Sequence, residues 1–306
     1  MSSQVLTLCS VLFFLMLQPT QACLWTYETD LQGRVHMVNK HSPEHYADGL
    51  LQSRDSDFWK SQAERLRDSG PADLQARNDL AVALIRTGRT EEALPILLQI
   101  EREHPGQYET ASNLGTAYEL LGDVDKAHQW IEEGMKRNPK SHYGSEWVHL
   151  EILETKKRLL DQPEWLRANR ILPDNADTPQ KVGSRVADLE YQLHERLSLV
   201  DPPDPIVAAL LFELGDLQGR LGSAERAAQV YQLALRYQPA NEEQVRERLA
   251  EAQKAVDSRK WLVSLLNEYG HPVQLVMMGG GLVLLLLIGV FLWRRLRRKQ
   301  KTTVSG

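Results

Sequence analysis

Apolar side chains in the middle of the chain recur every three or four residues, as on one face of a helix. Glycines and prolines interrupt this pattern at regular places, with a glycine after one helical stretch and a proline after the next. Glycine readily ends a helix and proline cannot continue one. Residues 74–260 are therefore predicted to form a series of antiparallel helix pairs.

The pattern of small residues repeats along the sequence. The pairs Gly88 and Gly122, Ala93 and Ala127, and Pro105 and Pro139 are each 34 residues apart. A third copy lies further on, with Leu214, Gly215, Gly222, Ala227, Tyr231, Ala234 and Pro239 in the corresponding order. The chain resembles the tetratricopeptide repeat family on these residues. The resemblance implies an all-α solenoid of helix-turn-helix units in which no single repeat buries its apolar face alone.

The remaining segments are predicted from composition. Residues 23–73 are an amino-terminal helical extension, in which 23–41 show no clear period and Asp57–Asp68 form a helix with Trp59, Ala63 and Leu66 on one face. Two repeats occupy 74–141, degenerate helical repeats 142–207, the third clear repeat 208–241 and a capping helix 242–260. The connection Leu172–Gln180 is polar and contains two prolines, which predicts a surface loop.

Both ends of the chain favour membrane targeting. Val5–Leu17 is an apolar run too short to span a bilayer, and residues 1–22 are predicted to be a signal peptide, the alternative being an uncleaved anchor. Cleavage after Ala22 would leave Cys23 first, either lipidated or as a free cysteine.

At the other end, residues 273–293 are predicted to form one carboxyl-terminal transmembrane helix, since Leu275–Trp293 contains no charge. Six basic residues in the tail 294–306 place that end in the cytoplasm and the body outside it, with removal of the tail as the alternative.

Charge and motifs limit the function. The chain carries a net charge of −5. The body between the two termini contains 30 basic and 41 acidic residues, which gives it a net charge of −11. So acidic a body argues against a nucleic-acid partner. Two cysteines exclude a disulfide framework, and the absence of an Asn-X-Ser/Thr sequon favours a bacterial envelope protein.

No catalytic motif is complete. His194-Glu195 begins like a zinc motif, but Ser198 stands where the second histidine is required. The alternative to a non-enzyme is an envelope enzyme or metal-handling protein using Cys23 with His36, His41 and His45, although these histidines suit a plain surface extension better. We predict no cofactor and no metal site.

The resemblance implies where a partner would bind. In this family the first helix of each repeat lines a concave groove that holds a protein or peptide. The matching positions are Asn78, Val82, Ile85 and Arg86 in the first repeat, Ser112, Thr116 and Glu119 in the second, and Phe212, Asp216 and Arg220 in the third. The lysine and asparagine clamp of some members is incomplete here. The alternative for each residue is packing within the superhelix. The predicted function is a membrane-anchored, non-catalytic scaffold outside the cytoplasm.

Overall fold

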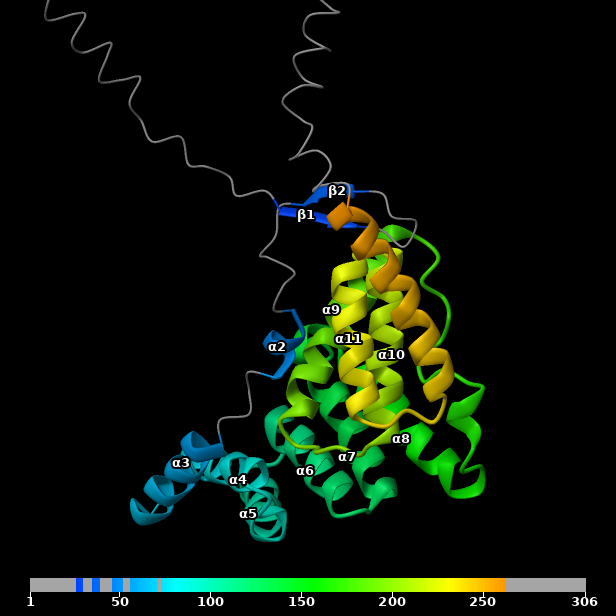
Figure 1. Cartoon of the computed structure of the whole chain (residues 1–306). Coiled ribbons are helices and arrows are strands. Elements are labelled where there is room, and N and C mark those ends of the chain that lie inside the picture. Colours follow the sequence, from blue (N-terminus) through cyan, green and yellow to red (C-terminus); the bar gives the residue numbers. More distant parts are fainter. Residues whose placement is uncertain (1–25, 30–34, 39–45, 52–55, 71–72, 262–306) are drawn as a thin grey trace, which may run out of the picture. The chain divides into compact units, whose positions relative to one another are not determined.

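The computed structural model describes residues 26–29, 35–38, 46–51, 56–70 and 73–261 (Figure 1). Contacts divide the chain into residues 1–255 and 256–306. The architecture below concerns the first of these units. Of the second unit, only residues 256–261 are described, and they are helical.

Two consecutive helix pairs form the first repeats. They are α4 (Leu74–Arg86) with α5 (Thr90–Glu103), and α6 (Tyr108–Leu120) with α7 (Val124–Arg137). Gly88 and Gly122 lie between the helices of each pair with φ of +74° and +85°, a conformation that side chains with a Cβ rarely adopt. The predicted turns are therefore confirmed, and so is their glycine requirement.

The core of the first repeats is a cluster of aliphatic residues from successive helices. Leu84, Leu97 and Leu114 are almost completely buried, and α3 (Ser56–Asp68) adds Ala63 to the same cluster. Trp59 and Leu66 of α3 pack against it, as their shared face predicted. Arg137 joins the two pairs through two hydrogen bonds of 2.8 Å to the carboxylate of Glu101.

The third repeat consists of α10 (Pro205–Arg220) and α11 (Ala224–Arg236), which lie side by side in Figure 1. Asp204 caps α10 by accepting a hydrogen bond from the N–H of Val207 at 2.7 Å, with Pro205 in the first turn. Residues 242–261 form a further helix, over the stretch where a capping helix was expected.

The amino-terminal segment differs from the prediction. Strands β1 (Thr26–Thr29) and β2 (Val35–Val38) form an antiparallel pair, and α2 (Tyr46–Leu51) follows. The expectation of a purely helical extension is wrong for this hairpin, whereas the repeat units are all helical, as predicted. The strands contain four residues each, too short to give a recognisable alternation, although their β-branched residues suit a sheet.

Two long helices separate the second repeat from the third. They are α8 (Glu146–Asp161) and α9 (Pro179–Leu197), accompanied by the 3-10 turns η2 (Ser141–Gly144) and η3 (Trp165–Arg167). The predicted surface loop Leu172–Gln180 is wrong in part, because Leu172 and Ala176 are buried and α9 already begins at Pro179. Polar composition concealed the two apolar residues that anchor the segment.

Within the part of the chain that the structure describes, no helix is long and apolar enough to cross a membrane. The predicted signal peptide (1–22), the transmembrane helix (273–293) and the basic tail (294–306) lie outside the described residues.

Candidate partner-binding groove

A cavity of about 120 Å³ lies between the first helices of the first two repeats and the chain that follows them. Six of the predicted groove residues line it: Val82, Ile85 and Arg86 of α4, and Ser112, Thr116 and Glu119 of α6. The spacing of these residues places them on one face of each helix. The structure thus brings together nearly all of the candidates from these two repeats.

Asn78 is the exception in this region. Its side-chain oxygen accepts a hydrogen bond of 2.9 Å from the side-chain amide of Asn113. Asn113 lines the cavity, whereas Asn78 does not. Asn78 therefore joins α4 to α6 and reaches the cavity through its partner.

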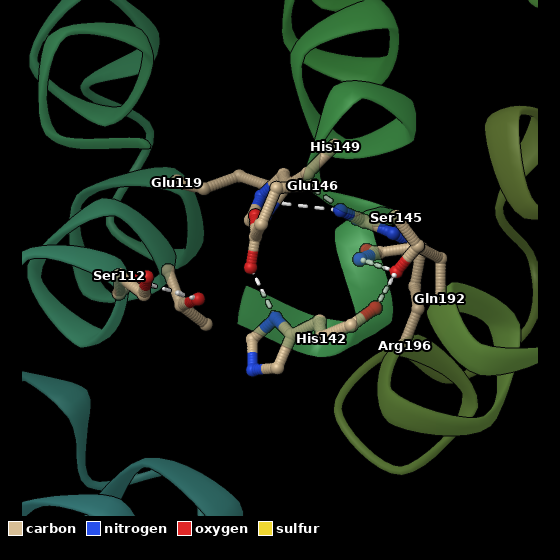
Figure 2. A network of polar contacts seen from close by, with 9 residues as sticks. Ser112, Glu119, His142, Ser145, Glu146, His149, Gln192 and Arg196 are labelled. Carbon is tan, nitrogen blue, oxygen red and sulfur yellow. Dashed lines mark hydrogen bonds and ion pairs between the residues drawn. The ribbon is translucent and has the colours of Figure 1, made fainter. Parts of the chain in front are cut away.

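A buried ionic network closes one side of the cavity (Figure 2). Glu119 of α6 accepts hydrogen bonds of 2.7 and 3.1 Å from the guanidinium of Arg196 of α9. His149 Nε2 of α8 lies 2.6 Å from Glu119 Oε2, and Lys156 Nζ lies 2.7 Å from Oε1. One carboxylate therefore holds three helices together through three cationic partners.

The network fixes the charge of its members. Burial by itself raises the pKa of Glu119, but the positive charges of Arg196, His149 and Lys156 outweigh it and hold that pKa well below its usual range. Burial lowers the pKa of His149, but the neighbouring Glu119 carboxylate more than compensates and raises it. The network therefore favours the charged form of both groups.

A second carboxylate extends the network. Glu146, at the start of α8, pairs with His142 Nδ1 and lies 3.7 Å from His149 Nδ1. Burial raises its pKa, but the hydrogen bond from His142 and the charge of His149 outweigh burial and lower the pKa to about 2. His142 and Tyr143 have left-handed backbone conformations, with φ of 47° and 57°. This unusual turn directs the His142 ring onto Glu146.

Three buried polar atoms, each on a residue that lines the cavity, have no hydrogen-bond partner among the described residues. They are Ser112 Oγ, Glu146 Oε2 and Arg196 Nε. A buried polar atom without a partner costs free energy. Ser112 Oγ lies against α7, since a Cβ on Gly134 would be 2.8 Å from it. The cavity combines polar residues, among them Asn113 and Thr116, with the aliphatic side chains of Val82 and Ile85. This mixture suits a short segment of a polypeptide.

The sequence did not reveal the residues that α8 and α9 contribute. Glu146, His149 and Arg196 lie outside the recognisable repeats, so no repeat position marks them. His194-Glu195 was considered only as part of a zinc motif, yet Glu195 pairs with Arg86 at the edge of the cavity. The only available signal was an arginine among the apolar positions of α9.

The third-repeat candidates lie elsewhere. Phe212, Asp216 and Arg220 of α10 do not line this cavity, and Phe212 is buried. Asp216 accepts a hydrogen bond of 2.7 Å from the Tyr231 hydroxyl and pairs with Arg170. The ten predicted residues therefore do not form one continuous groove.

The predicted amino-terminal chemistry falls mostly outside the described residues. Cys23, His41 and His45 are not described, and His36 belongs to β2. In the described part of the chain, no group of three or more histidine, cysteine, aspartate or glutamate side chains could hold a metal ion. The metal alternative stays an untested prediction.

The fold defines a helical repeat protein. Family models described as tetratricopeptide repeat match residues 60–108, 108–141 and 208–241. The first match begins within α3, inside the segment that the sequence assigned to an extension. The chain therefore contains tetratricopeptide repeats, which indicate a scaffold for interactions between proteins.

Two other comparisons add little. A solved structure entitled "MamA RS-1 ArsTM double mutant" is 17% identical to this chain, and the match covers 65% of this chain and 96% of that one. Its TM-score is 0.29, and so low a score carries no argument about this protein. The comparison with curated proteins found no match.

Proposed function

We propose that the chain is a non-catalytic scaffold that binds a segment of a partner protein in the cavity between the first two repeats. One observation carries this proposal: six of the seven groove positions predicted for these repeats line a single cavity. A second hollow of about 550 Å³ shares Ile85, Arg86, Leu120 and Leu199 with the first and extends past Trp59. A peptide could therefore continue from one hollow into the other.

The chemistry of the walls supports a partner segment with both apolar and polar groups. Val82 and Ile85 provide aliphatic surface, whereas the side chains of Thr116 and Asn113 provide hydrogen-bonding groups. Arg86, which lies over the Trp59 ring at 4.8 Å, stands between the two hollows. Arg86 already pairs with Glu195, so its remaining guanidinium N–H groups suit a carbonyl oxygen of the partner.

A photoreactive amino acid at Val82 tests the proposal in cells. We expect a discrete crosslinked partner at Val82, and none at the exposed Gln129 of α7. Thr116→Arg introduces a large side chain into the cavity and should abolish the crosslink. A thermal melt of Thr116→Arg shows whether the fold survives. Equal crosslinking from Val82 and Gln129, or a crosslink that persists in a folded Thr116→Arg variant, would contradict the proposal.

We also propose that the scaffold is anchored by residues 273–293 and that its repeats lie outside the cytoplasm. The uncharged stretch Leu275–Trp293 and the basic residues behind it support this orientation. Protease added to spheroplasts should digest the repeats and leave a tag at the carboxyl end protected. Survival of the repeats together with loss of the tag would reverse the orientation.

A further inference from the structure

A short irregular segment of the chain, residues 170–176, lies on the first helix of the third repeat. All three groove residues predicted for that helix contact it. Arg170 lies over the Phe212 ring at 5.6 Å and pairs with the carboxylate of Asp216. Arg220 donates a hydrogen bond to the carbonyl oxygen of Ala176. The surface that would hold a partner in this family is here covered by the chain itself.

Main-chain groups of the segment supply many of these contacts. The N–H groups of Ile171 and Leu172 donate hydrogen bonds of 2.6 and 3.1 Å to the two carboxylate oxygens of Glu213. Arg185 of α9 donates a hydrogen bond of 3.1 Å to the carbonyl oxygen of Pro173. Recognition through the main chain is how binding domains hold extended peptides, with pockets for a few side chains adding specificity.

The side chains of the segment fit such pockets. Ile171 and Leu172 are 4% and 6% exposed, although regular secondary structure is absent between η3 and α9. Glu213 itself is 4% exposed, and burying a carboxyl group costs free energy that an apolar contact to the loop would not. The two carboxylate oxygens of Glu213 bind two consecutive backbone N–H groups. Any peptide has such a pair of N–H groups unless one of the two residues is proline.

We propose that residues 170–176 are an internal pseudo-ligand, and that the α10 surface also binds a partner peptide with an arginine followed by two aliphatic residues. The arginine would pair with Asp216 beside the Phe212 ring, and the next two backbone N–H groups would bind Glu213. This inference rests on the proposed scaffold function, since it assigns a second partner segment to the third repeat.

Competition with the internal segment determines the expected affinity. The segment is tethered, so its effective concentration at α10 is on the order of millimolar. A free peptide of the same sequence must displace it and should bind the wild-type chain weakly. Weakening the internal segment should expose the surface and tighten binding of the free peptide.

The test uses a fluorescein-labelled peptide with the sequence of residues 168–177 and the full chain. In Ile171→Asp/Leu172→Asp, two negative charges next to Glu213 should release the internal segment. We expect the peptide to bind this variant at least tenfold more tightly than wild type, by fluorescence anisotropy. Leu160→Asp, at a residue that is 78% exposed, is the matched control and should leave affinity unchanged.

Two further changes test the assigned chemistry. A peptide carrying glutamate in place of Arg170 should bind the released variant at least fivefold more weakly. Adding Asp216→Asn to the released variant should weaken the unchanged peptide similarly, because asparagine can still accept the Tyr231 hydrogen bond but carries no charge. Failure of the peptide to bind a released variant that keeps its helical circular dichroism and cooperative melt would overturn the proposal.

A second measurement applies if the released variant does not fold. A photoreactive version of the peptide at high concentration should label wild-type protein within residues 205–220, and unlabelled peptide should compete. Labelling elsewhere would overturn the proposal. The crosslinks from Val82 test the cavity at α4 and α6, whereas the peptide tests the surface of α10. Failure of the proposed scaffold function and failure of the α10 site can therefore be told apart.

Discussion

Two buried glutamates on the first helices of neighbouring recognisable repeats have opposite surroundings. Glu119 on α6 is 5% exposed and Glu213 on α10 is 4% exposed. Glu119 is held by the cationic side chains of α8 and α9, whereas Glu213 accepts hydrogen bonds from the backbone of residues 171 and 172. Similar repeats thus acquire different inner surfaces, because segments outside the repeat pattern cover them.

The two surroundings also give opposite electrostatics. The cations around Glu119 overcome its burial and lower its pKa. Burial raises the pKa of Glu213 to about 7, since two backbone hydrogen bonds and Arg170 only partly offset the loss of water. The charged form of Glu119 therefore contributes to stability near neutral pH, and the charged form of Glu213 diminishes it.

Removing the charge of Glu119 should have the largest effect. Glu119→Gln leaves the buried Arg196 and the partly buried Lys156 without this anion, and His149 with only the more distant Glu146. The change should cost about 3–5 kcal/mol of unfolding free energy. Urea unfolding at pH 7 measures this loss. In the wild type, Glu119 becomes protonated and loses its charge when the pH falls well below 4.5. The difference in unfolding free energy between the wild type and Glu119→Gln should therefore shrink at those pH values.

The exposed Glu91 of α5 provides the matched control. Glu91→Gln makes the same chemical change outside any buried network and should alter stability by less than about 0.5 kcal/mol. A cost below about 1 kcal/mol for Glu119→Gln would mean that the network does not hold α6, α8 and α9 together.

Adding a methyl group at the closest helix crossings should have the next largest effect. A Cβ at Gly115 would lie 2.4 Å from Ile131 Cδ1, and one at Gly215 would lie 2.4 Å from Tyr231 Cε1. Overpacking of this kind costs about 1–3 kcal/mol. Gly215→Ala should cost more, because the hydroxyl of Tyr231 is held by Asp216 while the end of Ile131 can rotate away.

Thermal unfolding of Gly115→Ala and Gly215→Ala measures the difference between the two crossings. Ile131→Ala combined with Gly115→Ala provides a check. Ile131 is buried, so its truncation destabilises the protein by itself, but it also creates room for the new methyl group. The double variant should therefore lose less stability than the sum of the two single losses. Identical melting temperatures for both glycine variants and the wild type would contradict the close crossings.

The pH dependence of Glu213 should give the smallest effect. The folded state keeps a proton on Glu213 up to about pH 7, whereas the ordinary carboxyl group loses it at 4.5. The folded state therefore binds more protons between these values, and its stability falls as the pH rises through this window. Glu213→Gln stays neutral, so its stability relative to wild type should improve by about 1–3 kcal/mol from pH 5 to 8.

Urea unfolding of both proteins at several pH values measures this slope. A constant penalty from a lost hydrogen bond in Glu213→Gln shifts the curve without changing its slope. If instead the stability of Glu213→Gln relative to wild type falls as the pH rises, the surroundings of Glu213 favour the carboxylate.

Much of the helical framework could be predicted from the sequence. The glycines at 88, 122 and 222 mark turns because their left-handed backbone excludes other residues, and Gly115 and Gly215 mark crossings because no Cβ fits there. The hairpin of β1 and β2 escaped prediction because four-residue strands give too short a pattern. The burial of Leu172 escaped because the residues that follow it, 174–180, are mostly polar.

The sequence by itself determined the repeat units and which helix faces turn inward, since these depend on local spacing and backbone conformation. Only the tertiary structure decided what covers those faces. Arg196 meets Glu119 across 77 residues, and Ile171 meets Glu213 across 42. Such pairings depend on how the long segments between the repeats fold back onto the helices. The periodicity of the sequence does not determine where these segments pack.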